Sequence, residues 1–189
     1  MDDALEPGEA WGVVVEADRG SLPFALLHGE PLVACAAWAM GEAGVTLLDA
    51  TTPWDDVRDG GVPLVWHDAL CPMTPPDFLA ACVRRALATG VPVAGVLPVA
   101  DTVKEVHTTA DGPVVGETLD RDRLRRLASP VVVPPGLLTT LHDWPPSDFA
   151  ATLALLRGRG PVELVAGPPA VRRVHDAGDI ALLEAISAR

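Results

Sequence analysis

The sequence predicts an α/β domain in which a parallel sheet is covered by helices on both faces. Three observations predict this class: the apolar runs are short and rich in Val and Leu, helical patterns separate them, and 49% of the residues are hydrophobic against 21% charged. Strands that are apolar throughout must be buried on both faces, which requires helices on either side of the sheet. The length of 189 residues suits a single domain, residues 1–189.

The N-terminal half of the chain alternates between strand and helix patterns. The apolar run at residues 11–16 predicts a buried strand, and residues 31–40 predict a helix with proline in its first turn. A second helix is expected over residues 74–88, with Thr74 as its N-cap and Gly90 as its stop. Further strands are expected over residues 45–48, 62–66 and 91–99.

Residues 101–130 interrupt this alternation and predict an inserted β-hairpin arm. The sequence Asp111-Gly112-Pro113 is a turn signal between two extended runs, residues 102–108 and 114–119. A two-stranded ribbon is only marginally stable by itself in water. We therefore expect the arm to pack on a second subunit, in a homodimer.

The C-terminal part of the chain returns to the α/β pattern. Residues 147–156 predict a helix capped by Ser147, and residues 176–188 predict a closing amphipathic helix capped by Asp176. Between these helices we expect a strand over residues 162–165 and a short extended piece at residues 172–174.

The charge of the chain excludes several classes of partner. Its 14 basic and 26 acidic side chains give a formal net charge of −12. Nucleic-acid and polybasic membrane surfaces need clustered positive charge, so we expect neither nucleic acid nor a membrane as a partner. No apolar run approaches the roughly 20 residues that span a bilayer. The acidic start, with Asp2 and Asp3, differs from a signal peptide and favours a cytoplasmic location.

The cysteines do not predict a disulfide framework or a metal site. There are three of them, Cys35, Cys71 and Cys82, and two fall in helical apolar patterns that indicate small core residues. His67, Asp68 and Cys71 lie close together in the sequence, but a zinc site needs further ligands at a suitable spacing, and none is evident.

Several short motifs follow one another along the chain and together resemble one family. They are HDALCP at residues 67–72, LPVADTVK at 97–104, TLDR at 118–121 before Ser129-Pro130, and LVAG at 164–167 before Arg173 and DIAL at 179–182. In this order they resemble the 2-C-methyl-D-erythritol 4-phosphate cytidylyltransferases of isoprenoid biosynthesis. Several short matches in one order are far more specific than any one of them.

The resemblance implies both a fold and a reaction. The fold is a Rossmann-like nucleotidyltransferase three-layer sandwich, with the hairpin arm crossing to the neighbouring subunit and completing its site. In the reaction, the phosphate of a sugar or polyol phosphate such as 2-C-methyl-D-erythritol 4-phosphate attacks the α-phosphate of CTP, pyrophosphate leaves and Mg²⁺ assists. Such chemistry needs fixed cations and N–H groups directed at the phosphoryl oxygens.

The same resemblance implies roles for individual residues. Asp68 and Arg173 are the candidate catalytic residues, with Arg173 standing in place of a catalytic lysine. Asp68 is also the candidate Mg²⁺ ligand; its alternative role is to cap a turn or a helix. Arg19 and Gly20 are the candidate nucleotide-binding residues. The candidate substrate-binding residues are Thr102, Lys104, which is the one lysine of the chain, Arg121 and Ser129.

The sequence departs from the family pattern at the opening loop. Glu16 and Asp18 stand where the family has a Gly-rich triphosphate loop, and Phe24 stands in place of its lysine. Two carboxylates beside a triphosphate repel it. In addition, Cys71 replaces an arginine expected to contact the substrate phosphate, and residues 49–61 form a short acidic loop in place of a helix that helps to hold cytosine.

These departures predict a divergent cytidylyltransferase-like protein in which CTP transfer is impaired or lost. Its role would then be binding, regulation or scaffolding, with a small phosphate or nucleotide as the possible ligand. The alternatives are an active CTP-dependent nucleotidyltransferase, in which Arg19 and Gly20 hold the phosphates, and a purely structural protein. A cluster of arginines on the arm either receives a phosphate or an acidic partner or forms a solvated, salt-bridged surface; its members are Arg121, Arg123, Arg125 and Arg126.

Overall fold

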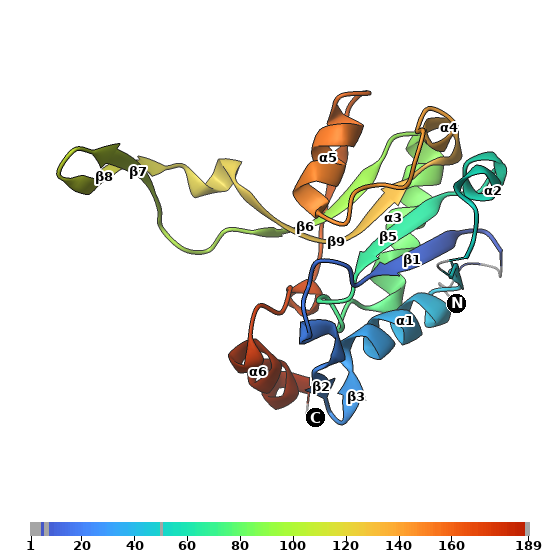
Figure 1. Ribbon diagram of the computed structural model, residues 1–189, viewed down its shortest axis with the longest axis horizontal. Coiled ribbons are helices and arrows are strands. Elements are labelled where there is room, and N and C mark those ends of the chain that lie inside the picture. The colour runs from blue at the N-terminus through green and yellow to red at the C-terminus, as the bar shows by residue number, and fades with distance from the viewer. Residues whose placement is uncertain (1–4, 6–7, 50, 188–189) are drawn as a thin grey trace.

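A six-stranded sheet, in the order β10-β6-β9-β5-β1-β4, forms the centre of the molecule (Figure 1). The computed structural model describes residues 5, 8–49 and 51–187 of the chain. The strands of this sheet are β1 (Trp11–Val15), β4 (Thr46–Leu47), β5 (Leu64–Asp68), β6 (Val93–Pro98), β9 (Arg125–Val133) and β10 (Glu163–Ala166).

One strand of the sheet, β9, runs antiparallel to both of its neighbours, β5 and β6. The expectation of a parallel sheet is therefore wrong at this strand, and the sequence pattern did not predict a strand over Arg125–Val133. The cause is the arm: β6 leads the chain out of the domain and β9 brings it back beside β6, so these two strands run in opposite directions. The remaining pairs are parallel, which keeps the predicted α/β class.

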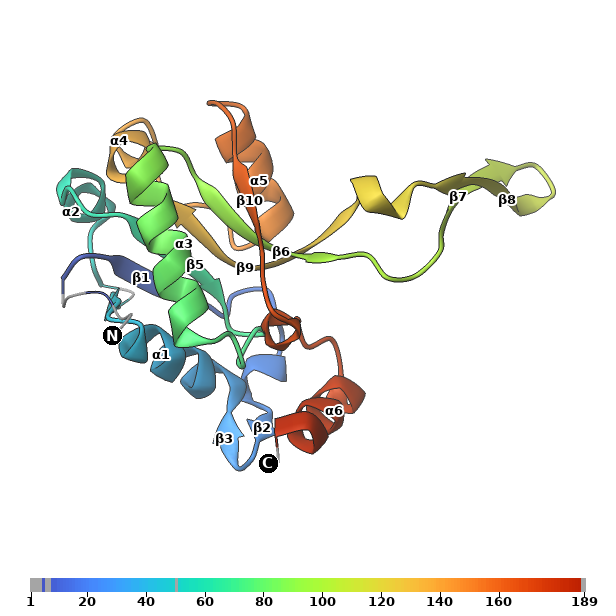
Figure 2. The ribbon, with the colours of Figure 1, turned by 180° about the vertical axis from the view of Figure 1, so that it is seen from behind.

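Helices cover both faces of the sheet, giving the three layers predicted (Figures 1 and 2). Helices α1 (Leu32–Glu42) and α3 (Pro76–Thr89) bury one face in a core that includes Met40 and Leu79. The opposite face packs against α2 (Trp54–Asp59), α4 (Pro135–Leu138) and α5 (Phe149–Arg157). No helix in the described part of the chain is long and apolar enough to cross a membrane.

The short helix α2 corrects the prediction of a loop over residues 49–61. It begins after Pro53 and carries Asp55 and Asp56 in its first turn, where negative charge is stabilised by the helix dipole. Its residue Val57 is fully buried. Its six residues are too few to show a helical period in the sequence, so only the acidic character was recognised.

Two of the predicted N-caps lie elsewhere. Helix α3 begins at Pro76 with Pro75 as N-cap, while the Thr74 hydroxyl donates to the carbonyl of Cys71 at 2.9 Å. Helix α5 is capped by Asp148, whose carboxylate accepts from Ala151 N–H at 2.7 Å, and not by Ser147. The stop at Gly90 is confirmed, with a left-handed φ of +68°.

The C-terminal segment forms a third, smaller core. Helix α6 (Ala177–Ser187) packs with the short hairpin of β2 (Leu26–Leu27) and β3 (Glu30–Pro31), burying Leu27 and Leu183. Asp176 accepts from Asp179 N–H at 3.0 Å, as the predicted cap requires. Two single-turn segments complete the fold: η1 (Leu22–Phe24) and η3 (Pro169–Val171).

The arm projects away from the domain, as Figures 1 and 2 show. Strands β7 (Val103–Thr109) and β8 (Gly112–Leu119) form a two-stranded antiparallel sheet, which confirms the predicted hairpin. The turn η2 (Arg121–Arg123) then leads into β9. Most arm residues are exposed, among them Val106 and Val115 at 64% and 74%.

Candidate functional site

Asp68 lies at the C-terminal end of β5 and is held between two arginines. Its carboxylate accepts from Arg19 Nε at 3.0 Å on Oδ1 and from Arg173 Nε at 2.9 Å on Oδ2. Leu70 N–H also donates to Oδ1, at 3.0 Å. Only 4% of the Asp68 side chain is exposed, so three segments far apart in the sequence meet at one buried carboxylate.

All three side-chain nitrogens of Arg19 donate hydrogen bonds. Its Nη2 lies 3.4 Å from Asp68 Oδ2 and donates to the carbonyl of Ser147 at 2.8 Å, while Nη1 donates to the carbonyl of Ala17 at 2.8 Å. The guanidinium also lies over the Phe149 ring, 5.9 Å from its centroid. With 7% of its side chain exposed, Arg19 ties the opening loop to β5 and to the residues before α5.

The charges around Asp68 keep it ionised. Burial raises the pKa of this carboxyl, but the hydrogen bonds from Arg19, Leu70 N–H and Arg173 outweigh it, so the pKa lies below its usual value. Both oxygens are already in contact with cationic donors. The pair of arginines leaves the cluster with one net positive charge.

Asp68 is the residue predicted to bind Mg²⁺, and both of its oxygens accept from guanidinium groups of this chain. The described residues contain no group of three or more His, Cys, Asp or Glu side chains that could hold a metal ion by themselves. In phosphoryl-transfer sites Mg²⁺ is usually bound by one or two carboxylates together with substrate phosphates. The metal role of Asp68 therefore stays a prediction.

His67 and Ser129 form a buried pair beneath Asp68. Asp68 N–H donates to Ser129 Oγ at 2.9 Å, and the same oxygen lies 2.5 Å from His67 Nδ1, at hydrogen-bond distance. The other ring nitrogen, His67 Nε2, is buried and has no hydrogen-bond partner among the described residues. Burial lowers the pKa of His67 to about 4, and the ring is neutral at pH 7. Ser129, a predicted substrate-binding residue, is thus fully buried and joins β9 to β5.

The other predicted site residues lie apart from Asp68 within one chain. Thr102, Lys104 and Arg121 are exposed on the arm. The Lys104 ammonium donates to the Thr118 hydroxyl, and Arg121 Nη1 donates to the carbonyl of Ala100 at 2.7 Å. Gly20 follows Arg19 in the opening loop, exposed and with a left-handed φ of +60°. The structure therefore joins Arg19, Asp68 and Arg173, while the arm residues remain predictions for a dimer.

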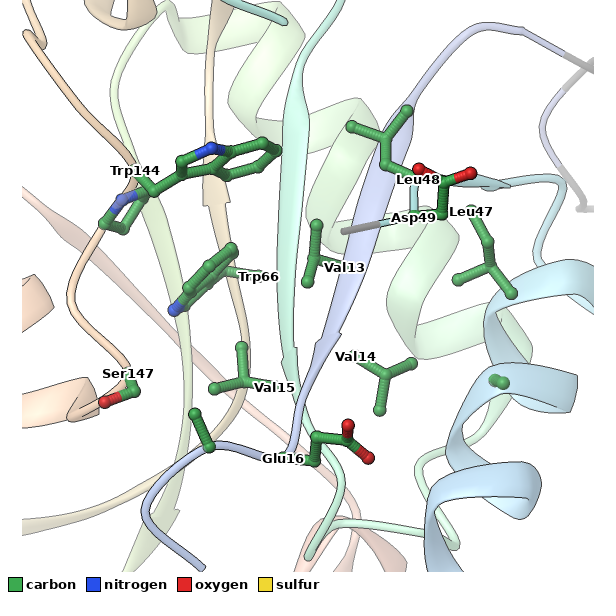
Figure 3. A pocket seen from close by; sticks show the side chains of 13 residues that line it. Val13, Val14, Val15, Glu16, Leu47, Leu48, Asp49, Trp66, Trp144 and Ser147 are labelled. Carbon is green, nitrogen blue, oxygen red and sulfur yellow. The ribbon is translucent and has the colours of Figure 1, made fainter. Parts of the chain in front are cut away.

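A cavity of about 560 Å³ opens beside the end of β1 (Figure 3). The indoles of Trp66 and Trp144 form one wall, stacked with ring centroids 6.0 Å apart and planes inclined by 27°. Trp66 Nε1 donates to the carbonyl of Pro146 at 3.1 Å, which fixes its ring. The two carboxylates of the lining belong to Glu16 and Asp49, and no Lys, Arg or His is among the described residues that line it.

Sequence reasoning did not identify this aromatic wall. The tryptophans are scattered along the chain and were expected as core or interface anchors. Their pairing joins β5 to the segment before α5 and depends on the three-dimensional packing. The acidic residue Glu16, which the sequence predicts to oppose a phosphate, is among the residues that line the cavity.

Comparisons with known proteins agree with the fold. Residues 57–189 match the family model described as 2-C-methyl-D-erythritol 4-phosphate cytidylyltransferase, IspD. The enzyme of that name from Saccharopolyspora erythraea is 38% identical over 135 residues, covering 70% of this chain and 58% of the relative. The one from Corynebacterium diphtheriae is 30% identical over 183 residues, covering 94% and 66%. The chain spans about half the length of the first curated relatives that it matches.

Solved structures give the same fold at low sequence identity. The 4-diphosphocytidyl-2C-methyl-D-erythritol synthase from Anaerococcus prevotii superposes with a TM-score of 0.67 at 14% identity, covering 100% of this chain and 98% of the other. The 2-C-methyl-D-erythritol 4-phosphate cytidylyltransferase from Thermus thermophilus gives a TM-score of 0.66 at 19% identity, covering 94% and 98%. At these identities the likeness establishes the three-layer architecture alone.

Proposed function

Because the chain belongs to the 2-C-methyl-D-erythritol 4-phosphate cytidylyltransferase (IspD) family, we propose that it is a divergent member in which CTP transfer is impaired or absent. The observation that carries this proposal is the pairing of Asp68 with Arg19 and Arg173. Both oxygens of this carboxylate accept from arginines, so a metal ion would have to compete with two charge-assisted hydrogen bonds. The two arginines are, in turn, engaged by that carboxylate.

The surface beside this cluster also opposes a triphosphate. Glu16 lines the cavity at the end of β1, and Asp18 accepts from the Ser147 hydroxyl at 2.5 Å. Repulsion between a carboxylate and a phosphate charge about 4 Å away amounts to about 1 kcal/mol at the dielectric constant of water. It rises to about 4 kcal/mol at the effective dielectric constant of a protein surface. The cation nearest in sequence is Arg19, which is buried in its own ion pair.

We propose further that the protein acts as a dimer through its arm. The support is the exposed apolar surface of the hairpin, with Val106, Val114 and Val115 between 47% and 74% exposed. The arm also carries Arg121, Arg123, Arg125 and Arg126 on exposed positions. A phosphate ligand of the dimer would be bound by these arginines across the subunit interface.

Two measurements test the proposal. Titration calorimetry with CTP and Mg²⁺ is expected to show no micromolar binding, and incubation with CTP, Mg²⁺ and 2-C-methyl-D-erythritol 4-phosphate is expected to release no pyrophosphate. An active family member is the positive control for both. Heat of binding at micromolar CTP, or sustained pyrophosphate release, would overturn the proposal. Light scattering at micromolar protein concentration tests the dimer, and a monomeric mass would contradict it.

The second candidate function is an active nucleotidyltransferase of altered specificity. It is favoured by the position of Arg173, which lies 2.9 Å from Asp68 where the family motif expects a catalytic cation. This function predicts pyrophosphate release from at least one nucleoside triphosphate with a sugar or polyol phosphate. Arg173→Ala would abolish the release, whereas Arg159→Ala, on an exposed position after α5, would leave it unchanged.

A further inference from the structure

Strand β1 extends past the strand that covers its outer edge. Strand β4 pairs with β1 at Trp11 and Gly12, and Leu48 N–H donates to the carbonyl of Gly12 at 2.8 Å. The chain then turns at Asp49, whose carbonyl accepts from Thr52 N–H at 3.2 Å. Because β1 continues to Val15, its last residues have no strand beside them on this side among the described residues.

The backbone groups of Val14 lie on this side of β1. Trp11 N–H donates to the carbonyl of Pro63, and the carbonyl of Val15 accepts from Ala69 N–H, so the odd-numbered residues of β1 bond to β5 and its flanks. Gly12 faces β4 instead. Since alternate residues of a parallel strand bond to opposite neighbours, the N–H and C=O of Val14 face the open edge. An open edge of this kind is a template for pairing with another chain.

The cavity surrounds this edge on both faces of the sheet. Val15 and Trp66 belong to the core on the α5 face, whereas Val14 and Ala37 of α1 lie on the opposite face. Figure 3 shows Trp66 on one side of β1 and Val14 on the other. A flat small molecule would occupy one of these faces. An extended peptide places successive side chains on alternate faces and so matches the shape of the whole cavity.

The charge around the edge is negative on one face. Glu16 and Asp49 line the cavity, and both are exposed. The hydroxyl and the N–H of Thr51 donate to Asp49 Oδ1 at 2.6 and 2.8 Å, and these bonds lower the pKa of Asp49 below its usual value. Glu16 comes two residues after Val14, and Asp49 comes two residues after Leu47, which pairs with Gly12. Since every second side chain of a strand lies on the same face, both carboxylates lie on the face covered by α1.

We propose that the open edge of β1 binds an extended peptide of a partner protein as an additional strand. The peptide alternates apolar or aromatic residues, which contact Trp66 and Trp144, with lysine or arginine, which face Glu16 and Asp49. Backbone hydrogen bonds to Val14 supply affinity, and the alternating side chains supply specificity. The aliphatic stems of lysine or arginine cover Val14 and the neighbouring part of α1. This interaction is not a step of nucleotide transfer, although it uses the cavity whose Glu16 opposes a triphosphate.

Hydrogen exchange and titration with a synthetic peptide test the proposal. The probe is an acetylated, amidated peptide of alternating valine and lysine. On saturation with this peptide, exchange of the Val14 amide is expected to slow at least about ten-fold, the change that a backbone hydrogen bond of about 1.4 kcal/mol produces. The amides of Val13 and Val15, which already bond to β5, serve as internal controls and are expected to remain unchanged.

Matched peptides and variants separate strand addition from other binding. N-methylation of alternate peptide residues, which removes the N–H groups facing β1, is expected to weaken binding at least about ten-fold. The combined Glu16→Gln and Asp49→Asn variant is expected to weaken binding and to reduce its salt dependence, while Glu42→Gln, exposed at the end of α1, leaves both unchanged. Equal affinity for the N-methylated peptide, equal affinity for a valine–glutamate peptide, or an unaltered Val14 amide would each overturn the proposal.

Discussion

Replacing Asp68 by asparagine removes the charge that holds two arginines in the fold. The shape of the side chain is kept, and the amide oxygen still accepts from Leu70 N–H. The same oxygen can still accept from Arg19 Nε, but the negative charge that pairs with both arginines disappears. In place of Oδ2, which accepts from Arg173 Nε at 2.9 Å, the variant has an NH2 group that cannot accept. The substitution therefore removes the charge of the cluster and one acceptor.

The magnitude follows from burial and from the number of bonds. A hydrogen bond to a charged group contributes about 1.5–3 kcal/mol, and breaking a buried ion pair costs about 3–5 kcal/mol because a charge is left without its partner. The side chain of Arg19 is 7% exposed, so without Asp68 it would be a buried charge lacking its partner. The side chain of Arg173 is 32% exposed, so solvent reduces the contribution of its ion pair to stability. We expect Asp68→Asn to lower the free energy of unfolding by about 3 kcal/mol, or the Tm by about 6–12 °C.

Urea unfolding at pH 7, followed by tryptophan fluorescence, measures this difference. Because the folded-state pKa of Asp68 lies below its unfolded value, the stabilisation is complete above the unfolded pKa of about 4 and is lost as the pH falls through the folded pKa. The difference between wild type and Asp68→Asn should therefore shrink in acid. The control is Asp77→Asn, an exposed aspartate in the first turn of α3, which should cost at most about 1 kcal/mol.

A small effect would refute the reasoning. If Asp68→Asn lowers the unfolding free energy by less than about 1 kcal/mol at pH 7, the two arginines do not depend on this carboxylate. The same conclusion would follow from a difference that persists unchanged at acidic pH. In either case Asp68 would be free to act on a ligand, and the proposal of impaired CTP transfer would lose its principal support.

Three further predictions concern residues whose burial or close packing the structure gives. His67 protonates near pH 6.5 when unfolded but only near 4 when folded, so stability should fall by about 3 kcal/mol from pH 7 to pH 4, and acid titration of His67→Gln should lack this part of the loss. A Cβ on Gly95 would lie 2.9 Å from a backbone carbonyl of β9, so Gly95→Ala should cost about 1–3 kcal/mol in urea unfolding. Iodoacetamide should label the half-buried Cys35 of the native protein before the buried Cys71 and Cys82, as peptide mass analysis would show; equal rates would contradict the burial.

Much of the fold was accessible from the sequence because its strands and helices carry strong local patterns. The buried run Leu64–Asp68 and the capped, periodic helix Pro76–Thr89 are of this kind. Strand β9 was missed because the sequence there contains Ser129-Pro130 and ends in two prolines, which read locally as a loop. Its strand conformation is set by pairing with β5 and β6, an interaction that the local sequence does not encode.

The sequence pointed to individual residues of the candidate site but not to the contacts between them. Asp68 and Arg173 were found through motifs, and Arg19 through its place in the opening loop. Their mutual contacts span separations of 49 and 105 residues along the chain, so no local pattern shows that both arginines pair with Asp68. The pairing of Trp66 with Trp144 in the cavity wall was not predicted, because these residues come together only in the folded chain.

The shortened opening loop connects these features of the site. Asp18 adopts a left-handed φ of +62° and accepts from the Ser147 hydroxyl, which turns the chain so that Arg19 enters the space between β5 and the segment before α5. Any phosphate that approached Arg19 would have to displace the Asp68 carboxylate and the carbonyl of Ser147, both already at hydrogen-bond distance. Arg19, the one cation of this loop, is therefore already bonded to Asp68 and Ser147. Glu16 and Asp49 set the charge of the cavity, and both carboxylates oppose a polyanion there.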